Sequence, residues 1–118
     1  MQKIYHLSSC DTCKRIIKEL APSNVFLFQD IKHHHIDPKQ LEALRALSGS
    51  YQALFSKRAR LYKERALKEQ TLSEQDYKEL LLEHYTFLKR PVIVNQDQIF
   101  IGNSKKAVAQ AKISLQNK

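Results

Sequence analysis

Two cysteines stand three positions apart, where a strand-like segment gives way to a helical pattern. The β-prone residues 3–7 are followed by two serines typical of a turn, and then by Cys10 and Cys13. One helical face is next formed by Cys13, Ile16, Ile17 and Leu20. This arrangement predicts a strand, a tight turn and a helix whose first residues carry both thiols.

The remaining strand-like runs flank a long helical stretch. A short, fully apolar run at 25–28 predicts a buried strand, so the chain would begin with a β-α-β unit of parallel strands. The apolar runs 92–94 and 99–101 border a polar turn, which predicts an antiparallel hairpin, and an amphipathic helix is expected over 107–115. The residues at about 36–88 would form a helical insertion between these halves.

Local signals for helix starts support that insertion. Asp37 can act as an N-cap, Gln40 completes a capping box with it, and Gly49 is placed to end the helix. Ser73 is a second capping residue, and the stretch 51–69 is expected to hold short helical pieces. The insertion should therefore consist of helices alone.

The order of elements defines the expected fold class. We predict an α/β, thioredoxin-like fold of the glutaredoxin type, with a mixed four-stranded sheet and a helical insertion between its β-α-β and β-β-α halves. The 118 residues are expected to form a single domain, 1–118. Only two glycines are present, which excludes the glycine-rich loops that cradle nucleotide phosphates.

The cysteine pair is the candidate for chemistry. A thiol at a helix N-terminus is close to unpaired N–H groups and the positive end of the helix dipole, so its pKa should lie below about 8.5. Cys10 is then the expected nucleophile, and Cys13, one turn along, could attack the sulfur of a Cys10 adduct. Two alternatives stay open: a zinc site that also uses residues 33–35, which are all histidine, and two unreactive packed thiols.

Charge and hydropathy restrict the kinds of binding partner and the cellular location that we expect. The net charge is +8, and residues 57–68 hold six cations and one anion. Such a block suits acidic protein surfaces, small anions or simply solvent, and direct DNA binding is not expected because stacking aromatics are few. No apolar run approaches the roughly 20 residues of a membrane helix, and no secretory signal precedes the first strand, so we expect a cytoplasmic protein without membrane association.

Several motifs along the chain resemble the ArsC family. They are Ile4-Tyr5-His6, Cys10-Asp11-Thr12-Cys13-Lys14-Arg15, Leu54-Phe55-Ser56, Tyr62-Lys63-Glu64, Leu88-Lys89-Arg90-Pro91-Val92-Ile93-Val94 and Ile101-Gly102. The resemblance covers about residues 2–115 and implies a thioredoxin-like sheet with a helical insertion. The family holds glutaredoxin-coupled arsenate reductases, YffB-like proteins and the Spx transcriptional regulators.

The resemblance also assigns roles to individual residues. It makes Cys10 the nucleophile and Arg90 a catalytic group that stabilises charge. It also matches Pro91 to a cis proline at the substrate site, and His6 to the histidine upstream of the nucleophile. Cys13 resembles the second cysteine of the regulators and of some reductases, which makes it a second catalytic thiol here.

Two positions depart from the reductases of the family. Ser56 and Asn103 stand where those proteins have further anion-binding arginines. Arg58, Arg60 or Lys105 could take their place, and Arg58 and Arg60 are the expected substrate-binding residues.

The resemblance implies two functions. The first is a thiol-dependent oxidoreductase that reduces an oxyanion, arsenate, or a disulfide. Glutathione would be its co-substrate, glutaredoxin or thioredoxin its partner, and no cofactor or metal would be bound. The alternative is an Spx-like redox-sensing regulator that binds the RNA polymerase α subunit and uses Cys10 and Cys13 as a switch.

Overall fold

The computed structural model describes residues 1–116 and separates into two compact units. The first unit joins Met1–His34 to the chain from Arg90 onward, and the second is the continuous segment His35–Lys89. The predicted insertion at about 36–88 therefore coincides with the second unit. The single-domain organisation stays a prediction.

The first unit contains a mixed four-stranded sheet with the order β2-β1-β3-β4. Its strands are β1 (Gln2–His6), β2 (Leu27–Asp30), β3 (Val92–Asn95) and β4 (Gln98–Ile101). β1 and β2 are parallel, while β3 is antiparallel to both β1 and β4. The thioredoxin-like order predicted from the sequence is confirmed.

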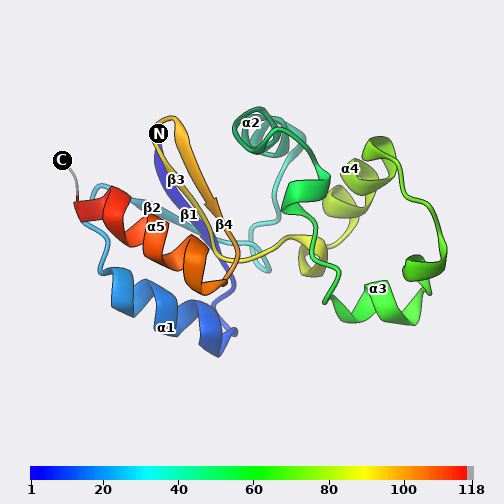
Figure 1. Cartoon of the computed structure of the whole chain (residues 1–118), viewed down its shortest axis with the longest axis horizontal. Helices are drawn as coiled ribbons and strands as arrows, with labels where there is room; N and C mark the ends of the chain where they lie inside the picture. The colour runs from blue at the N-terminus through cyan, green and yellow to red at the C-terminus, as the bar shows by residue number, and fades with distance from the viewer. Residues whose placement is uncertain (117–118) are drawn as a thin grey trace. The chain divides into compact units, whose positions relative to one another are not determined.

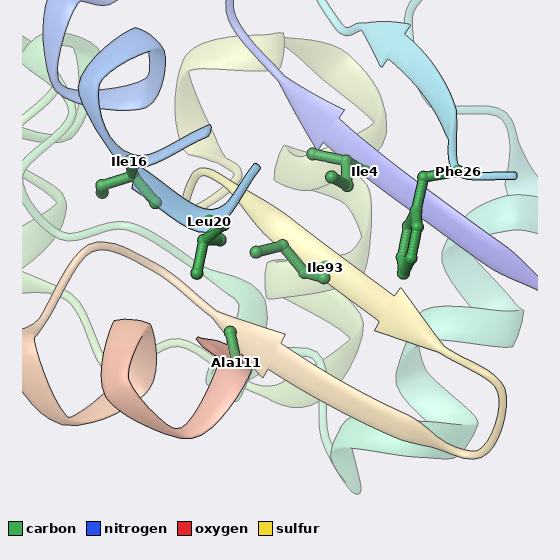
Figure 2. Close-up of a cluster of buried hydrophobic side chains, with 6 residues drawn as sticks. All are labelled: Ile4, Ile16, Leu20, Phe26, Ile93 and Ala111. Carbon is green, nitrogen blue, oxygen red and sulfur yellow. The ribbon is translucent and has the colours of Figure 1, made fainter. Parts of the chain in front are cut away.

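Two helices cover one face of this sheet. They are α1 (Asp11–Leu20) and α5 (Lys105–Gln116), which lie side by side (Figure 1). A buried cluster joins them to the strands, as Figure 2 shows: Ile4, Ile16, Leu20, Phe26, Ile93 and Ala111. The register places Ile4 opposite Ile93, so both side chains point toward the helices. This packing fixes the N-terminus of α1 at the end of β1.

The predicted buried strand at 25–28 is wrong in position and in exposure. The strand is Leu27–Asp30, and it forms an edge of the sheet. Leu27 and Phe28 are 64% and 48% exposed, and within the predicted run only Phe26 is buried. An edge strand has a neighbour on one side only, and a short apolar run does not distinguish an edge position from a central one.

The second unit is helical, with turns of 3-10 helix between its α-helices. The elements are α2 (Pro38–Ser48), η1 (Gln52–Leu54), α3 (Arg60–Glu64), η2 (Leu67–Glu69), α4 (Glu74–Glu83) and η3 (Tyr85–Phe87). Both predicted helix starts are confirmed, with reciprocal capping boxes at Asp37–Gln40 and Ser73–Asp76. Gly49 ends α2 in the left-handed conformation, at φ 90°.

Aromatic rings occupy the centre of the second unit. Phe55 is stacked on Phe87 with the ring centroids 5.2 Å apart, and it also contacts Tyr77 at 4.9 Å and Tyr62 at 5.8 Å. Phe55 forms an isolated β-bridge with Leu88, which ties the middle of this unit to its end. Aromatic pairs of this kind add to the free energy gained by burial.

Candidate active site

Cys10 occupies the N-cap of α1, at the end of a tight turn that leaves β1. Its backbone is extended, with φ −94° and ψ 112°, and its carbonyl accepts the N–H of Lys14 at 3.1 Å. Its own N–H donates to the Leu7 carbonyl at 3.0 Å, which closes a turn from Leu7 to Cys10. The thiol therefore lies at the helix N-terminus, as the sequence predicted.

The surroundings of Cys10 favour its thiolate. Partial burial opposes ionisation, but the pKa of the Cys10 thiol still lies below its ordinary value of 9.0. The causes are a hydrogen bond from the Cys13 backbone N–H, a second from the Cys13 thiol, and a hydrogen bond and positive charge from Arg90. Donors from the first helical turn and from a distant segment thus meet at one sulfur.

Cys13 has the opposite character. It is fully buried, and burial raises the pKa of its thiol to about 11, with the neighbouring Cys10 charge acting in the same direction. The Leu7 backbone N–H at its sulfur opposes that rise. Both cysteines are free. The pair therefore consists of a half-buried thiol whose ionisation is favoured and a fully buried thiol that donates a hydrogen bond to it.

Arg90 and Pro91 enter this site from the far end of the insertion. The peptide bond between them is cis, as the resemblance implied. Pro91 is buried, and its carbonyl accepts the Gly102 N–H at 2.9 Å, while β3 begins at the next residue. The half-buried Arg90 reaches the Cys10 sulfur. The structure thus brings together three of the predicted residues, Cys10, Cys13 and Arg90.

His6 is the last residue of β1 and lies beside the end of β2. Burial lowers the pKa of its imidazole, and the nearby Asp30 carboxylate partly offsets that effect. Its ring meets Phe28 edge-on, with centroids 5.6 Å apart. A neutral imidazole is therefore favoured at pH 7, and in that form it can accept a proton.

Arg58 and Arg60 belong to the second unit, where both are exposed. Arg60 begins α3 and pairs with Glu64 at 3.4 Å. Their predicted contact with substrate stays a prediction, and so does the substitution for the arginines replaced by Ser56 and Asn103.

The sequence analysis overlooked Asp30, the last residue of β2. Its carboxylate accepts hydrogen bonds from the hydroxyl and the backbone N–H of Ser8, in the turn that leads to Cys10. The only signal in the sequence was that Asp30 is a polar residue shortly after an apolar run. The parallel pairing of β1 and β2 then places it beside the end of β1.

Among residues 1–116, no three His, Cys, Asp or Glu side chains gather as a metal ion would require. The three consecutive histidines diverge: His33 pairs with Asp30 at 3.8 Å, while His35 bonds the Leu82 carbonyl at 2.8 Å. In the same part of the chain, no helix has the length and apolar character needed to cross a membrane.

Comparison with known proteins gives one family and a set of similar structures. The model of the ArsC family matches residues 5–111. A protein related to the ArsC family from Bacteroides fragilis is 23% identical, with 93% of this chain and 97% of that chain covered and a TM-score of 0.78. An arsenate reductase from Vibrio cholerae is 21% identical, with 93% and 98% covered and a TM-score of 0.74.

A third structure, of a Staphylococcus aureus protein solved by NMR in solution, is 29% identical, with 93% and 97% covered and a TM-score of 0.72. No curated protein matches the sequence significantly. The solved structures support the fold described above.

Proposed function

The chain belongs to the ArsC family, a family of thiol oxidoreductases, and from this premise we propose that it is a thiol-dependent reductase with Cys10 as nucleophile. The observation that carries the proposal is the Cys10 sulfur at the N-terminus of α1, which accepts a hydrogen bond from Arg90. A thiolate beside a guanidinium suits attack on an anionic substrate, because the cation offsets charge on the substrate oxygens. We propose arsenate as that substrate.

The reaction balances with thiols as the only reductant. The Cys10 thiolate attacks arsenic, and one arsenate oxygen leaves as water after protonation. A second thiolate then attacks the Cys10 sulfur, which breaks the sulfur–arsenic bond and leaves its electron pair on arsenic. Arsenite departs, and the two sulfurs become one disulfide. Glutathione is the proposed second thiol, and glutaredoxin or thioredoxin reduces the disulfide to regenerate Cys10.

Cys13 offers an internal alternative for the second thiol. The Cys10 negative charge is one cause of its high pKa, and that charge disappears once Cys10 is bonded to arsenic. Formation of the adduct therefore makes Cys13 easier to ionise, although burial still opposes it. A disulfide substrate would follow the same route, with Cys10 attacking one sulfur and Cys13 resolving the mixed disulfide.

A second candidate function follows from the contact between the two sulfurs. Cys10 and Cys13 already share a hydrogen bond, so their sulfurs lie close enough for an oxidant to join them in a disulfide. The exposed cations Lys57, Arg58, Lys63 and Lys68 of the second unit would suit an acidic partner. This combination supports an Spx-like regulator that binds the RNA polymerase α subunit, and some ArsC-like proteins are not enzymes. We propose a cytoplasmic location, because both functions depend on the thiol systems of a reducing compartment.

Arsenite production decides between these functions. Purified protein would be assayed with arsenate, glutathione, glutaredoxin and NADPH recycling. We expect turnover by the wild type and a loss on the order of a thousandfold in Cys10→Ser. Cys13→Ser keeps the nucleophile, and turnover that it retains with glutathione would assign the first attack to Cys10. Absence of turnover in the wild type, together with capture of the α subunit by the oxidised or reduced protein, would favour the regulator.

A further inference from the structure

The turn between β1 and α1 contacts both sulfurs. Its first residue, Leu7, directs its backbone N–H to the Cys13 sulfur, and its last residue is Cys10 itself. The conformation of this turn therefore sets the position of one thiol relative to the other. Any group that holds the middle of the turn also holds the Cys10 and Cys13 sulfurs in position relative to each other.

Asp30 holds the middle of that turn. The parallel register pairs Asp30 with His6, two residues before Ser8, so the carboxylate lies beside the turn. It accepts hydrogen bonds from the hydroxyl and the N–H of Ser8, and the Lys32 N–H donates to its other oxygen at 3.2 Å. The Asp30 side chain is 16% exposed, while Ser8 lies at the surface of the turn.

We propose that Asp30 is a positioning residue for the nucleophile, acting through Ser8 to hold the turn that aims the Cys10 sulfur at its donors. This inference rests on the proposed function of Cys10. The Cys13 N–H and the Arg90 guanidinium stabilise the thiolate only while the sulfur lies within hydrogen-bond range. A turn released from β2 loses that alignment, and the thiol becomes less reactive.

Asp30 connects the site to the edge of the sheet as well. His6 interacts with the same carboxylate, and His33 lies 3.8 Å from it. The Asp30 charge thus acts on two imidazoles, while its oxygens accept hydrogen bonds from Ser8 and Lys32. A mutation of Asp30 alone would be hard to interpret, because it also removes a negative charge. That removal by itself favours the nearby Cys10 thiolate.

Ser8 offers the cleaner test, since Ser8→Ala removes the hydroxyl without a change in charge. Alkylation of Cys10 by iodoacetamide would be followed from pH 5 to 10 in the native chain, with peptide mapping to separate it from buried Cys13. We expect Ser8→Ala to shift the profile to higher pH and to slow alkylation at pH 7 by about threefold. Ser8→Thr, which keeps the hydroxyl, should restore the wild-type profile.

The neighbouring Ser9→Ala is the matched control, because Ser9 lies exposed in the same turn. Asp30→Ala combined with Ser8→Ala should shift the profile no further than Asp30→Ala alone, as expected for two partners in one interaction. If Asp30→Ala does not fold, the comparison of Ser8→Ala with Ser8→Thr decides. A merely structural role would lower the thermal midpoint and leave the alkylation profile unchanged.

The outcomes separate this inference from the proposed function. A wild-type protein that reduces arsenate, with Ser8→Ala and Ser9→Ala indistinguishable in their profiles, overturns the positioning role alone. A protein that turns over no arsenate, but in which Ser8→Ala still shifts the Cys10 profile, overturns the arsenate proposal and keeps the positioning role.

Discussion

The two units of the chain are stabilised by different kinds of contact. In the first unit, β1 pairs with β3 across most of the sequence, and the core under the sheet is largely aliphatic. In the second unit, α2 and α4 each begin at a capping box between residues three positions apart, and aromatic rings form the centre.

This difference has a consequence for the chemistry. The proposed nucleophile belongs to the unit assembled from distant segments, and its stabilising cation, Arg90, follows the whole insertion. Local signals can start a helix, but they cannot place a guanidinium beside a thiol 80 positions earlier. The comparison predicts that mutations in the second unit change stability, and that changes in the long-range contacts of the first unit alter thiol reactivity.

The largest expected effect is on the stability of the aromatic cluster. Phe55→Ala removes a buried ring that contacts three others, and it should lower the free energy of unfolding by about 3–5 kcal/mol. Denaturant titration would measure it. Phe28→Ala is the matched control, because Phe28 is 48% exposed on the edge strand and should cost about 1 kcal/mol or less. Equal losses would show that the rings contribute no more than surface residues.

A smaller effect is expected from the long-range contact of the site. Arg90→Ala removes a donor and a positive charge from Cys10, so the pKa of that thiol rises. The pH profile of Cys10 alkylation therefore shifts to higher pH, and the alkylation rate at pH 7 falls by about tenfold. Arg15→Ala, on the exposed side of α1, carries the same loss of charge. A similar shift in both variants would assign the effect to net charge instead.

The smallest effect should come from a local helix signal. Ser73→Ala removes the side chain that accepts the Asp76 N–H at 3.2 Å, and it should cost about 1 kcal/mol of stability. Hydrogen exchange should quicken in the first turn of α4, while the alkylation profile of Cys10 stays unchanged. Ser23→Ala, at an exposed position before β2, should leave both readouts at wild-type values. A change in Cys10 reactivity in Ser73→Ala would contradict the prediction that mutations in the second unit affect stability alone.

The sequence predicted the parts of the fold that depend on neighbouring residues. A capping box joins residues three positions apart, so Asp37 and Ser73 identified the starts of α2 and α4. The hairpin of β3 and β4 followed from two apolar runs around a polar turn. The exposure of β2 could not be predicted, because it depends on the order of strands in the sheet.

The candidate site was predictable only in part, for the same reason. The position of Cys10 at a helix start followed from the pattern around it, whereas the role of Arg90 came from resemblance to a family. The contact between Ser8 and Asp30 spans 22 positions and depends on the parallel register, so no local pattern reveals it.

The split of the first unit across the sequence also orders events on the ribosome. Both cysteines are synthesised early, whereas β3 and Arg90 emerge only after the entire insertion. A nascent chain therefore holds thiols that lack the Arg90 guanidinium and one of the two inner strands of the sheet. We therefore expect the Cys10 sulfur to gain its contact with Arg90 only after the whole insertion has been synthesised.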